Sequence, residues 1–180
     1  MAKRVLVAVG GGIAAYKSAT LVSRLVQHGH TVHVALSSAG EKFIGQATFA
    51  ALTGRPVASD TFAQQQWPLG PHIELAAELD LMIVAPATAD LLAKLAQGIA
   101  DSLIPTLFLQ VACPVLLAPA MSNIMWEKPS VQRNLRQLQA DGVHLIGPEV
   151  GWLSCRRQGP GRMSEAEAIA QRAEELLTSV

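Results

Sequence analysis

The sequence has no excess of charge of either sign, few cysteines and no long apolar run, and each absence argues against a class of protein. Fourteen basic residues balance fourteen acidic ones among 180, whereas a nucleic-acid-binding surface would need a basic excess. The longest apolar runs, such as LMIVAPATA, are too short and too interrupted to span a membrane. The composition therefore argues against nucleic-acid and membrane partners.

The two cysteines, Cys113 and Cys155, have no paired spacing. They provide neither a disulfide framework nor a zinc site, so we expect no metal and a reducing, cytoplasmic location. The N-terminus MAKRVLVAVGGG combines basic residues with an apolar run. That run has about five residues before the glycines, fewer than the usual 7–15 of a signal peptide, so it is interpreted as a first strand.

Apolar runs alternate with helical periodicity along the chain. The apolar runs RVLVAV, TVHVALS, LDLMIVAP, PVLLAP and VHLIGP predict strands. A serine followed by a helix ending at Gly54 is predicted in SSAGEKFIGQATFAALTG. Other helices are predicted over 13–28, near 89–97, 101–111 and 129–141, and over 164–178, where Ser164 and Glu167 have capping-box spacing. The segment 55–72 is less regular, and we expect a mobile or partner-covered loop with a short strand.

Strands that alternate with helices and are apolar throughout indicate a parallel sheet covered on both sides. With 180 residues, we expect one domain over 1–180. Its fold class is α/β, a Rossmann-like or flavodoxin-like three-layer sandwich with a mainly parallel sheet. Ligands bind at the carboxyl ends of the strands in such sheets. The candidate loops are therefore GGGIAAYK, LSSAGEKF, APATADLL and APAMSNIMW.

The first of these loops resembles a phosphate-binding turn. Gly10, Gly12 and Ala15 fit G-x-G-x-x-A, a weak signal alone. A dinucleotide site would add an acidic residue after the second strand, where Ser37 and Ser38 stand instead. Backbone N–H groups at a helix start, together with these hydroxyls, suit one phosphate monoester, so FMN fits better than NAD. The alternative is that the glycines only allow close helix–strand packing.

Two further segments leave alternatives open. The loop from Pro86 to Asp90 is small and hydroxylated, so it could lie against a flat ring and hydrogen-bond to its polar edge. Equally, it could be an ordinary strand–helix turn capped by Thr88 or Asp90. His72 precedes the apolar IELAAEL, and a lone histidine is more often structural or merely exposed.

Five motifs taken together resemble the homo-oligomeric flavin-containing cysteine decarboxylases over nearly the whole chain. GGGIAAYK looks like the first FMN loop of that family, and HIELA looks like the segment with its active-site histidine. APATADLLAKLAQGIADSL is similar to the flavin-ring and ribityl segment. PAMSNIMW resembles the substrate motif P-x-M-N-x-x-M-W, and CRRQGPGRM resembles the substrate-recognition clamp that ends in G-x-G-R-M.

The chain departs from the family pattern at two places. Ser122 stands at the motif asparagine, and Asn123 comes one position later. The family clamp usually reads A-C-G-[DE], whereas this chain has Ser154-Cys155-Arg156-Arg157. An acidic position has thus become basic, which affects the substrate more than the flavin.

The resemblance implies an FMN-dependent enzyme that decarboxylates 4′-phosphopantothenoylcysteine to 4′-phosphopantetheine in coenzyme A biosynthesis. In that chemistry the cysteine side chain is oxidised to a thioaldehyde, which accepts the electrons released as CO₂ leaves, and the resulting enethiol is then reduced. Two alternatives stay open: a peptidyl-cysteine decarboxylase whose product is the enethiol, and a non-catalytic FMN-binding regulatory subunit. Cys155 argues against the first alternative, and Ser122 keeps the second open.

The resemblance also implies roles for particular residues. His72 would be the acid/base or carboxylate-orienting group, and Cys155 would donate the proton in the final reduction. The substrate would be held by Met121, Ser122, Asn123, Met125 and Arg162, with Trp126 in an apolar wall, although plain core is the alternative for the two methionines and Trp126. FMN would be held by Gly11, Gly12, Ile13, Ser37, Ser38, Pro86, Ala87, Thr88, Ser102 and Thr106.

The family is homo-oligomeric, and the resemblance therefore implies self-association. We expect a homotrimer or a multiple of trimers with FMN at the interface. A separate ligase is a further candidate partner. The ligase that is fused to some relatives is expected to be absent from this chain.

Overall fold

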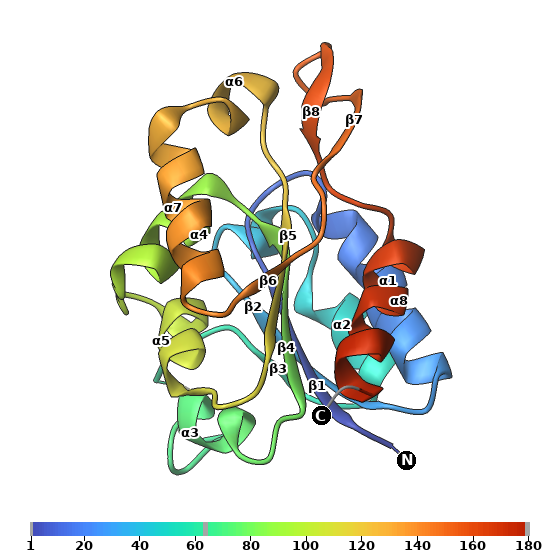
Figure 1. Cartoon of the computed structure of the whole chain (residues 1–180). Helices are drawn as coiled ribbons and strands as arrows, with labels where there is room; N and C mark the ends of the chain where they lie inside the picture. Colours follow the sequence, from blue (N-terminus) through green and yellow to red (C-terminus); the bar gives the residue numbers. More distant parts are fainter. Residues whose placement is uncertain (1, 63–64, 179–180) are drawn as a thin grey trace.

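A parallel β-sheet stands at the centre of the computed structural model, which describes residues 2–62 and 65–178. Six strands lie in the order β3-β2-β1-β4-β5-β6 (Figure 1). Their bounds are Arg4–Val9 for β1, Thr31–Leu36 for β2, Val57–Ala58 for β3, Leu81–Ala87 for β4, Val115–Pro119 for β5 and His144–Leu145 for β6. The predicted parallel α/β sheet is confirmed.

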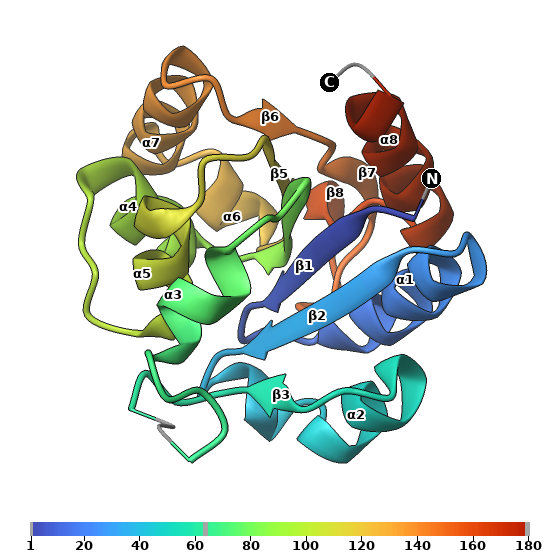
Figure 2. The same cartoon turned by 90° about the horizontal axis from the view of Figure 1, so that it is seen from below.

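Helices cover both faces of this sheet (Figures 1 and 2). One face carries α1 (Ala15–Gln27), α2 (Gln46–Thr53) and α8 (Ala166–Thr178). The other face carries α3 (Pro71–Ala76), α4 (Ala89–Gln97), α5 (Leu103–Gln110) and α7 (Pro129–Ala140). The short α6 (Asn123–Trp126) and the antiparallel hairpin of β7 (Glu149–Trp152) and β8 (Gln158–Arg162) stand at the carboxyl edge.

The alternation of side chains along β1 explains the three layers. Val5, Val7 and Val9 pack in the cluster that includes α1 and α8. Leu6 and Ala8 point the other way, into the cluster that includes α4, α5 and α7. Because both sets are fully buried, the strand reads as a continuous apolar run rather than as an alternating one.

The strand order also fixes where a ligand can bind. The chain runs outward from β1 through β2 to β3, then returns to β4 on the other side of β1. At such a switch point the loops after the two central strands diverge and leave a crevice. Gly10, directly after β1, packs against β4, since a Cβ on Gly10 would lie 2.3 Å from the carbonyl oxygen of Pro86. Packing therefore requires a glycine at this position.

Several element boundaries differ from the sequence prediction. The helix predicted up to Gly54 is broken: Gly40–Lys42 is a short 3₁₀ helix, and extended backbone at Gly45 separates it from α2. Gly54 does end α2, in the left-handed conformation. The tail helix begins at Ala166 rather than at Ser164, and β6 covers only two residues. A short strand does occur within 55–72, although residues 63 and 64 lie outside the described part.

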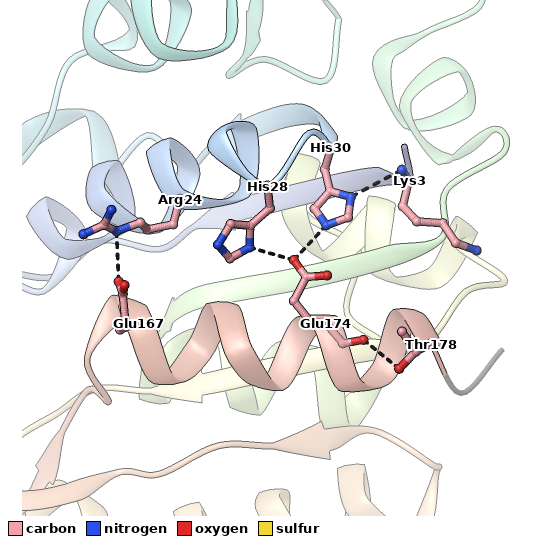
Figure 3. A network of polar contacts seen from close by, with 7 residues as sticks. All are labelled: Lys3, Arg24, His28, His30, Glu167, Glu174 and Thr178. Carbon is pink, nitrogen blue, oxygen red and sulfur yellow. Dashed lines mark hydrogen bonds and ion pairs between the residues drawn. The ribbon is translucent and has the colours of Figure 1, made fainter. Parts of the chain in front are cut away.

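Polar contacts tie α8 to the end of α1 (Figure 3). Glu174 Oε1 lies 2.8 Å from both His28 Nδ1 and His30 Nε2. The backbone N–H of Lys3 donates to His30 Nδ1 at 3.3 Å, so a neutral His30 with its proton on Nε2 satisfies both contacts. Burial raises the pKa of Glu174, but hydrogen bonds from His30 and His28 outweigh burial and lower that pKa overall. The C-terminal helix is thereby held to α1 by an ionised carboxylate.

The stability of the fold is expected to fall between pH 6.5 and about 4 because of His33. Burial, and then the charges of Arg55 and Arg4, lower its pKa from 6.5 to about 4. As the pH falls, the unfolded chain therefore binds a proton at His33 before the folded chain does. The stability that the neutral His33 contributes is complete above pH 6.5 and is lost as the pH falls toward 4. Allowing for solvent screening of the partly buried ring, we expect a loss of about 1–2 kcal/mol. Urea unfolding should show that the free energy of unfolding changes less between pH 7 and pH 4.5 for His33→Gln than for the parent protein. An identical change in both proteins would refute this role of His33.

Candidate functional site

Two adjoining cavities open at the carboxyl edge of the sheet. One has a volume of about 410 Å³ and is called here the hairpin cavity, because the β7–β8 hairpin forms one of its walls. The other has a volume of about 520 Å³ and is called the serine cavity, after Ser37, Ser38, Ser59 and Ser102 in its lining. Gly11 and Thr88 line both cavities. The two cavities are therefore neighbours at the carboxyl edge.

The serine cavity combines hydroxyl groups with a tight backbone turn. Ser37 Oγ accepts a hydrogen bond from the N–H of Gly40 at 2.9 Å, which fixes the loop after β2. A Cβ on Gly11 would lie 2.3 Å from the Cβ of Ala39, so only glycine lets the first loop come this close. Backbone N–H groups and hydroxyls that converge in this way suit a phosphate group.

The one lysine in the lining of the serine cavity is already neutralised. Lys94 Nζ lies 3.3 Å from Asp90 Oδ2 and 3.1 Å from Asp101 Oδ2. The hydrogen bond from Lys94 lowers the pKa of Asp101, and the hydrogen bond to Asp101 raises the pKa of Lys94. The Asp101 carboxylate therefore stays ionised beside the ammonium, and a phosphate here would depend on N–H and hydroxyl donors.

The residues predicted to hold FMN are only partly brought together. Gly11, Ser37, Ser38, Thr88 and Ser102 line the serine cavity, and Gly12 and Ile13 line the hairpin cavity. Thr88 also caps α4, because its side chain accepts from the N–H of Leu91 at 3.3 Å. Pro86, Ala87 and Thr106 line neither cavity: the first two are buried in β4, and the Thr106 hydroxyl donates to the Ser102 carbonyl at 2.8 Å.

A cluster of charges forms one wall of the hairpin cavity. Lys17 is only 8% exposed, and its Nζ donates to the Met163 carbonyl at 3.1 Å and to Glu165 Oε1 at 2.9 Å. Arg162 donates to the same Glu165 oxygen. The hydrogen bond from Lys17 is the main reason why the pKa of Glu165 is lowered. Two cations thus share one carboxylate, which leaves the wall with one net positive charge.

The predicted substrate residues separate into two groups. Met121, Ser122, Met125 and Arg162 line the hairpin cavity, and Ser122 Oγ also caps α6 by accepting from the N–H of Met125 at 3.3 Å. Asn123 and Trp126 are not in that lining. The Asn123 side chain lies against β8, since a Cβ on Gly159 would be 3.0 Å from the Asn123 Cβ. Its Oδ1 is buried and has no partner among the described residues.

The two residues predicted to be catalytic lie outside both cavities. His72 is in α3, at the end of the sheet away from the hairpin (Figure 1). Its Nδ1 is buried and lacks a hydrogen-bond partner within the described chain. Cys155 is exposed in the hairpin turn, one residue beyond Ser154, which does line the hairpin cavity. A single chain therefore does not bring His72 to the cavities.

Comparison with known proteins assigns the family. The model of the flavoprotein family matches residues 1–178. The chain belongs to the flavoprotein family. The coenzyme A biosynthesis bifunctional protein CoaBC of Mycobacterium tuberculosis is 45% identical over 175 residues, which are 97% of this chain and 41% of that protein. The flavoprotein thus spans about two fifths of the length of this curated relative.

Solved structures resemble the flavoprotein over nearly its full length. A mutant PPC decarboxylase complexed with pantothenoylaminoethenethiol superposes with a TM-score of 0.88 at 26% identity, covering 99% of this chain and 100% of that one. The FMN-dependent cysteine decarboxylase SpaF superposes with a TM-score of 0.82 at 28% identity, covering 97% of each chain. No helix within residues 2–62 and 65–178 has both the length and the apolarity that a membrane span needs.

Sequence reasoning missed several residues that form the hairpin cavity. Lys17 and Tyr16 belong to α1 and line the cavity, as do Trp152 and Leu153 of the hairpin. Trp152 is 68% exposed, which is unusual for such a large aromatic side chain. The signal in the sequence was the position of this tryptophan three residues before Cys155, where the clamp motif begins.

Proposed function

We propose that this flavoprotein binds FMN and decarboxylates 4′-phosphopantothenoylcysteine to 4′-phosphopantetheine in coenzyme A biosynthesis. The observation that carries the proposal is the pair of adjoining cavities that share Gly11 and Thr88. The serine cavity suits a phosphate-bearing flavin, and the hairpin cavity suits a thiol substrate that lies next to the flavin. The names of the CoaBC relative and of the PPC decarboxylase structure support the same reaction.

The residues of the serine cavity fit FMN. Gly11 leaves a cradle that a Cβ would fill, and Ser37, Ser38 and Ser102 provide hydroxyls around it. Lys94 is already paired with Asp90 and Asp101 and is therefore not available to pair with a second phosphate. This favours a mononucleotide over FAD. When bound, FMN supplies the two-electron chemistry that amino-acid side chains lack.

The hairpin cavity provides the groups that a cysteine-derived substrate needs. Arg162 and Lys17 supply positive charge for its carboxylate. Met121 and Met125 supply an apolar surface that keeps water from the reacting sulfur. Ser122, the N-cap residue of α6, is a candidate hydrogen-bond partner for an amide of the substrate.

The reaction is tested by supplying the purified protein with 4′-phosphopantothenoylcysteine. We expect release of CO₂ and 4′-phosphopantetheine, and the cofactor released from the yellow protein should run as FMN on chromatography. A nicotinamide or FAD peak would contradict the cofactor. An enethiol as final product would instead indicate a peptidyl-cysteine type of decarboxylase, which is the second candidate. No turnover with FMN bound would indicate a regulatory subunit.

We also propose a homotrimer, or a multiple of it, in which a neighbouring chain brings His72 to the cavities. The unpartnered Nδ1 of His72 and the exposed apolar side chains beside it, Leu69 and Ile73, support such a contact. Light scattering should give a mass of three chains or a multiple of three. A monomer with full flavin occupancy would contradict this arrangement.

The same proposal includes three further points. The protein is cytoplasmic, residues 1–180 form one domain, and a separate ligase is a partner. The relatives named for coenzyme A biosynthesis support the location. The family match over residues 1–178 supports the single domain. The word bifunctional in the name of the M. tuberculosis relative supports the accompanying activity.

A further inference from the structure

Strand β4 is irregular at the point where it reaches the cavities. Val84 pairs with Leu117 of β5. Three residues later Ala87 pairs with Pro119, which is only two residues beyond Leu117. The extra residue on β4 is a β-bulge, a feature that changes the direction of the chain and of the side chains after it. The pairing of β4 with β1 also ends at Val84. The register of the sheet therefore does not fix the orientation of the bulge, and contacts from outside the sheet become important.

A serine of α1 makes such a contact. Ser18 Oγ donates a hydrogen bond to the carbonyl oxygen of Ala85, inside the bulge, at 2.6 Å. Both residues are fully buried. A serine hydroxyl within a helix usually faces water or bonds to a carbonyl of its own helix, whereas this hydroxyl joins α1 to the sheet. Removing it would take a donor away from a buried carbonyl, which is costly.

The hydrogen bond connects the two loops that the cavities share. Ser18 lies in the helix that follows the first glycine loop, seven residues after Gly11. Ala85 lies three residues before Thr88, the N-cap of α4. Gly11 and Thr88 line both cavities. In the part of the chain that the structure describes, Ser18 itself belongs to neither lining. It therefore acts on a ligand only through these two loops.

We propose that Ser18 is a positioning residue for FMN, whose hydroxyl fixes the bulge of β4 and thereby the place of Thr88 relative to Gly11; this inference rests on the FMN binding proposed above. Thr88 Oγ1 accepts a hydrogen bond from the Leu91 N–H at 3.3 Å, so its O–H is left to donate to a ligand. The direction of that O–H depends on the backbone that follows the bulge. Tight sites hold such groups within about 0.5 Å of the required place.

The test measures FMN affinity by diluting the flavin-loaded protein and following the fluorescence of the released flavin. Ser18→Ala should raise the Kd about tenfold, the effect of losing one well-formed buried hydrogen bond. Ser18→Thr keeps the hydroxyl and should restore tighter binding than Ser18→Ala. The control Ser23→Ala removes a hydroxyl from the same helix. Ser23 Oγ accepts from Gln27 Nε2 at 2.9 Å and lines neither cavity, so this variant should keep the parental Kd.

A second control distinguishes positioning from a general loss of stability. Val26→Ala trims a partly buried side chain that packs against the core near the end of α1 remote from the glycine loop. It should lower Tm without changing the Kd for FMN. The proposal is overturned if Ser18→Ala keeps the parental Kd, if Ser18→Thr binds as weakly as Ser18→Ala, or if Val26→Ala weakens FMN binding as much. A parent protein that binds no FMN would instead refute the proposed function, and this inference with it.

Discussion

His72→Asn should keep the fold and the bound FMN but lose about 10²–10⁴-fold of the decarboxylation rate, as is typical when a general acid or base is removed. The fold and flavin content should survive because His72 is partly exposed on α3 and lines neither cavity of its own chain. Its Nδ1 has no hydrogen bond to lose within the described residues. The measurements are kcat under saturating substrate and flavin absorbance per chain.

A matched variant, His144→Asn in β6, removes an imidazole that also lies outside the cavity linings. It should turn over at close to the parental rate. Mixed oligomers of His72→Asn and Cys155→Ser chains would add a test of the shared site, since complementation requires that the two groups come from different chains. Turnover of His72→Asn within a few-fold of the parent would make His72 a structural residue.

Cys155→Ser should still oxidise and decarboxylate the substrate but stall before the final reduction. The last step needs a proton at the enethiol carbon, and a hydroxyl is a much weaker acid than a thiol. Cys155 is exposed beside Ser154 in the hairpin, so we expect the turn to close over the bound substrate when the thiol acts. Mass spectrometry should find a product two hydrogens lighter than phosphopantetheine, and reduced flavin should accumulate.

Cys113→Ser is the control for this variant. Cys113 precedes β5 and is half-buried, and burial raises the pKa of its thiol. It lines neither cavity, so phosphopantetheine should remain the product. If Cys155→Ser also gives unchanged phosphopantetheine output, Cys155 only forms part of the clamp.

The central sheet could be predicted from the sequence because its signals are local. The run from Val5 to Val9 is apolar at every position since both faces are covered, and Gly54 marks a helix end because it adopts a left-handed conformation. The hairpin could not be predicted in the same way. Its strands contain Gly159 and Gly161 and lack an alternating pattern, and contacts such as the bond from the Met121 N–H to the Gly161 carbonyl hold them in place.

The candidate site was predictable to a similar degree. Loops after parallel strands meet at one edge of a sheet, so Gly11, Ser37 and Thr88 could be expected together. Lys17 could not, because its place in the cavity depends on contacts with Met163 and Glu165, which follow 146 and 148 residues later. For His72 the sequence offers the HIELA motif, but the cavities of its own chain do not explain the role, since His72 lines neither of them.

The shared carboxylate of Glu165 makes the hairpin cavity insensitive to acidity near neutrality. The hydrogen bond from Lys17 lowers the pKa of Glu165 from its ordinary 4.5, so the carboxylate remains ionised across the neutral pH range. The contribution of Glu165 to the electrostatic potential at a bound substrate is therefore constant across that range. A break in a pH–rate profile near neutrality then reports a proton on a group other than Glu165, either on another side chain or on the phosphate of the substrate.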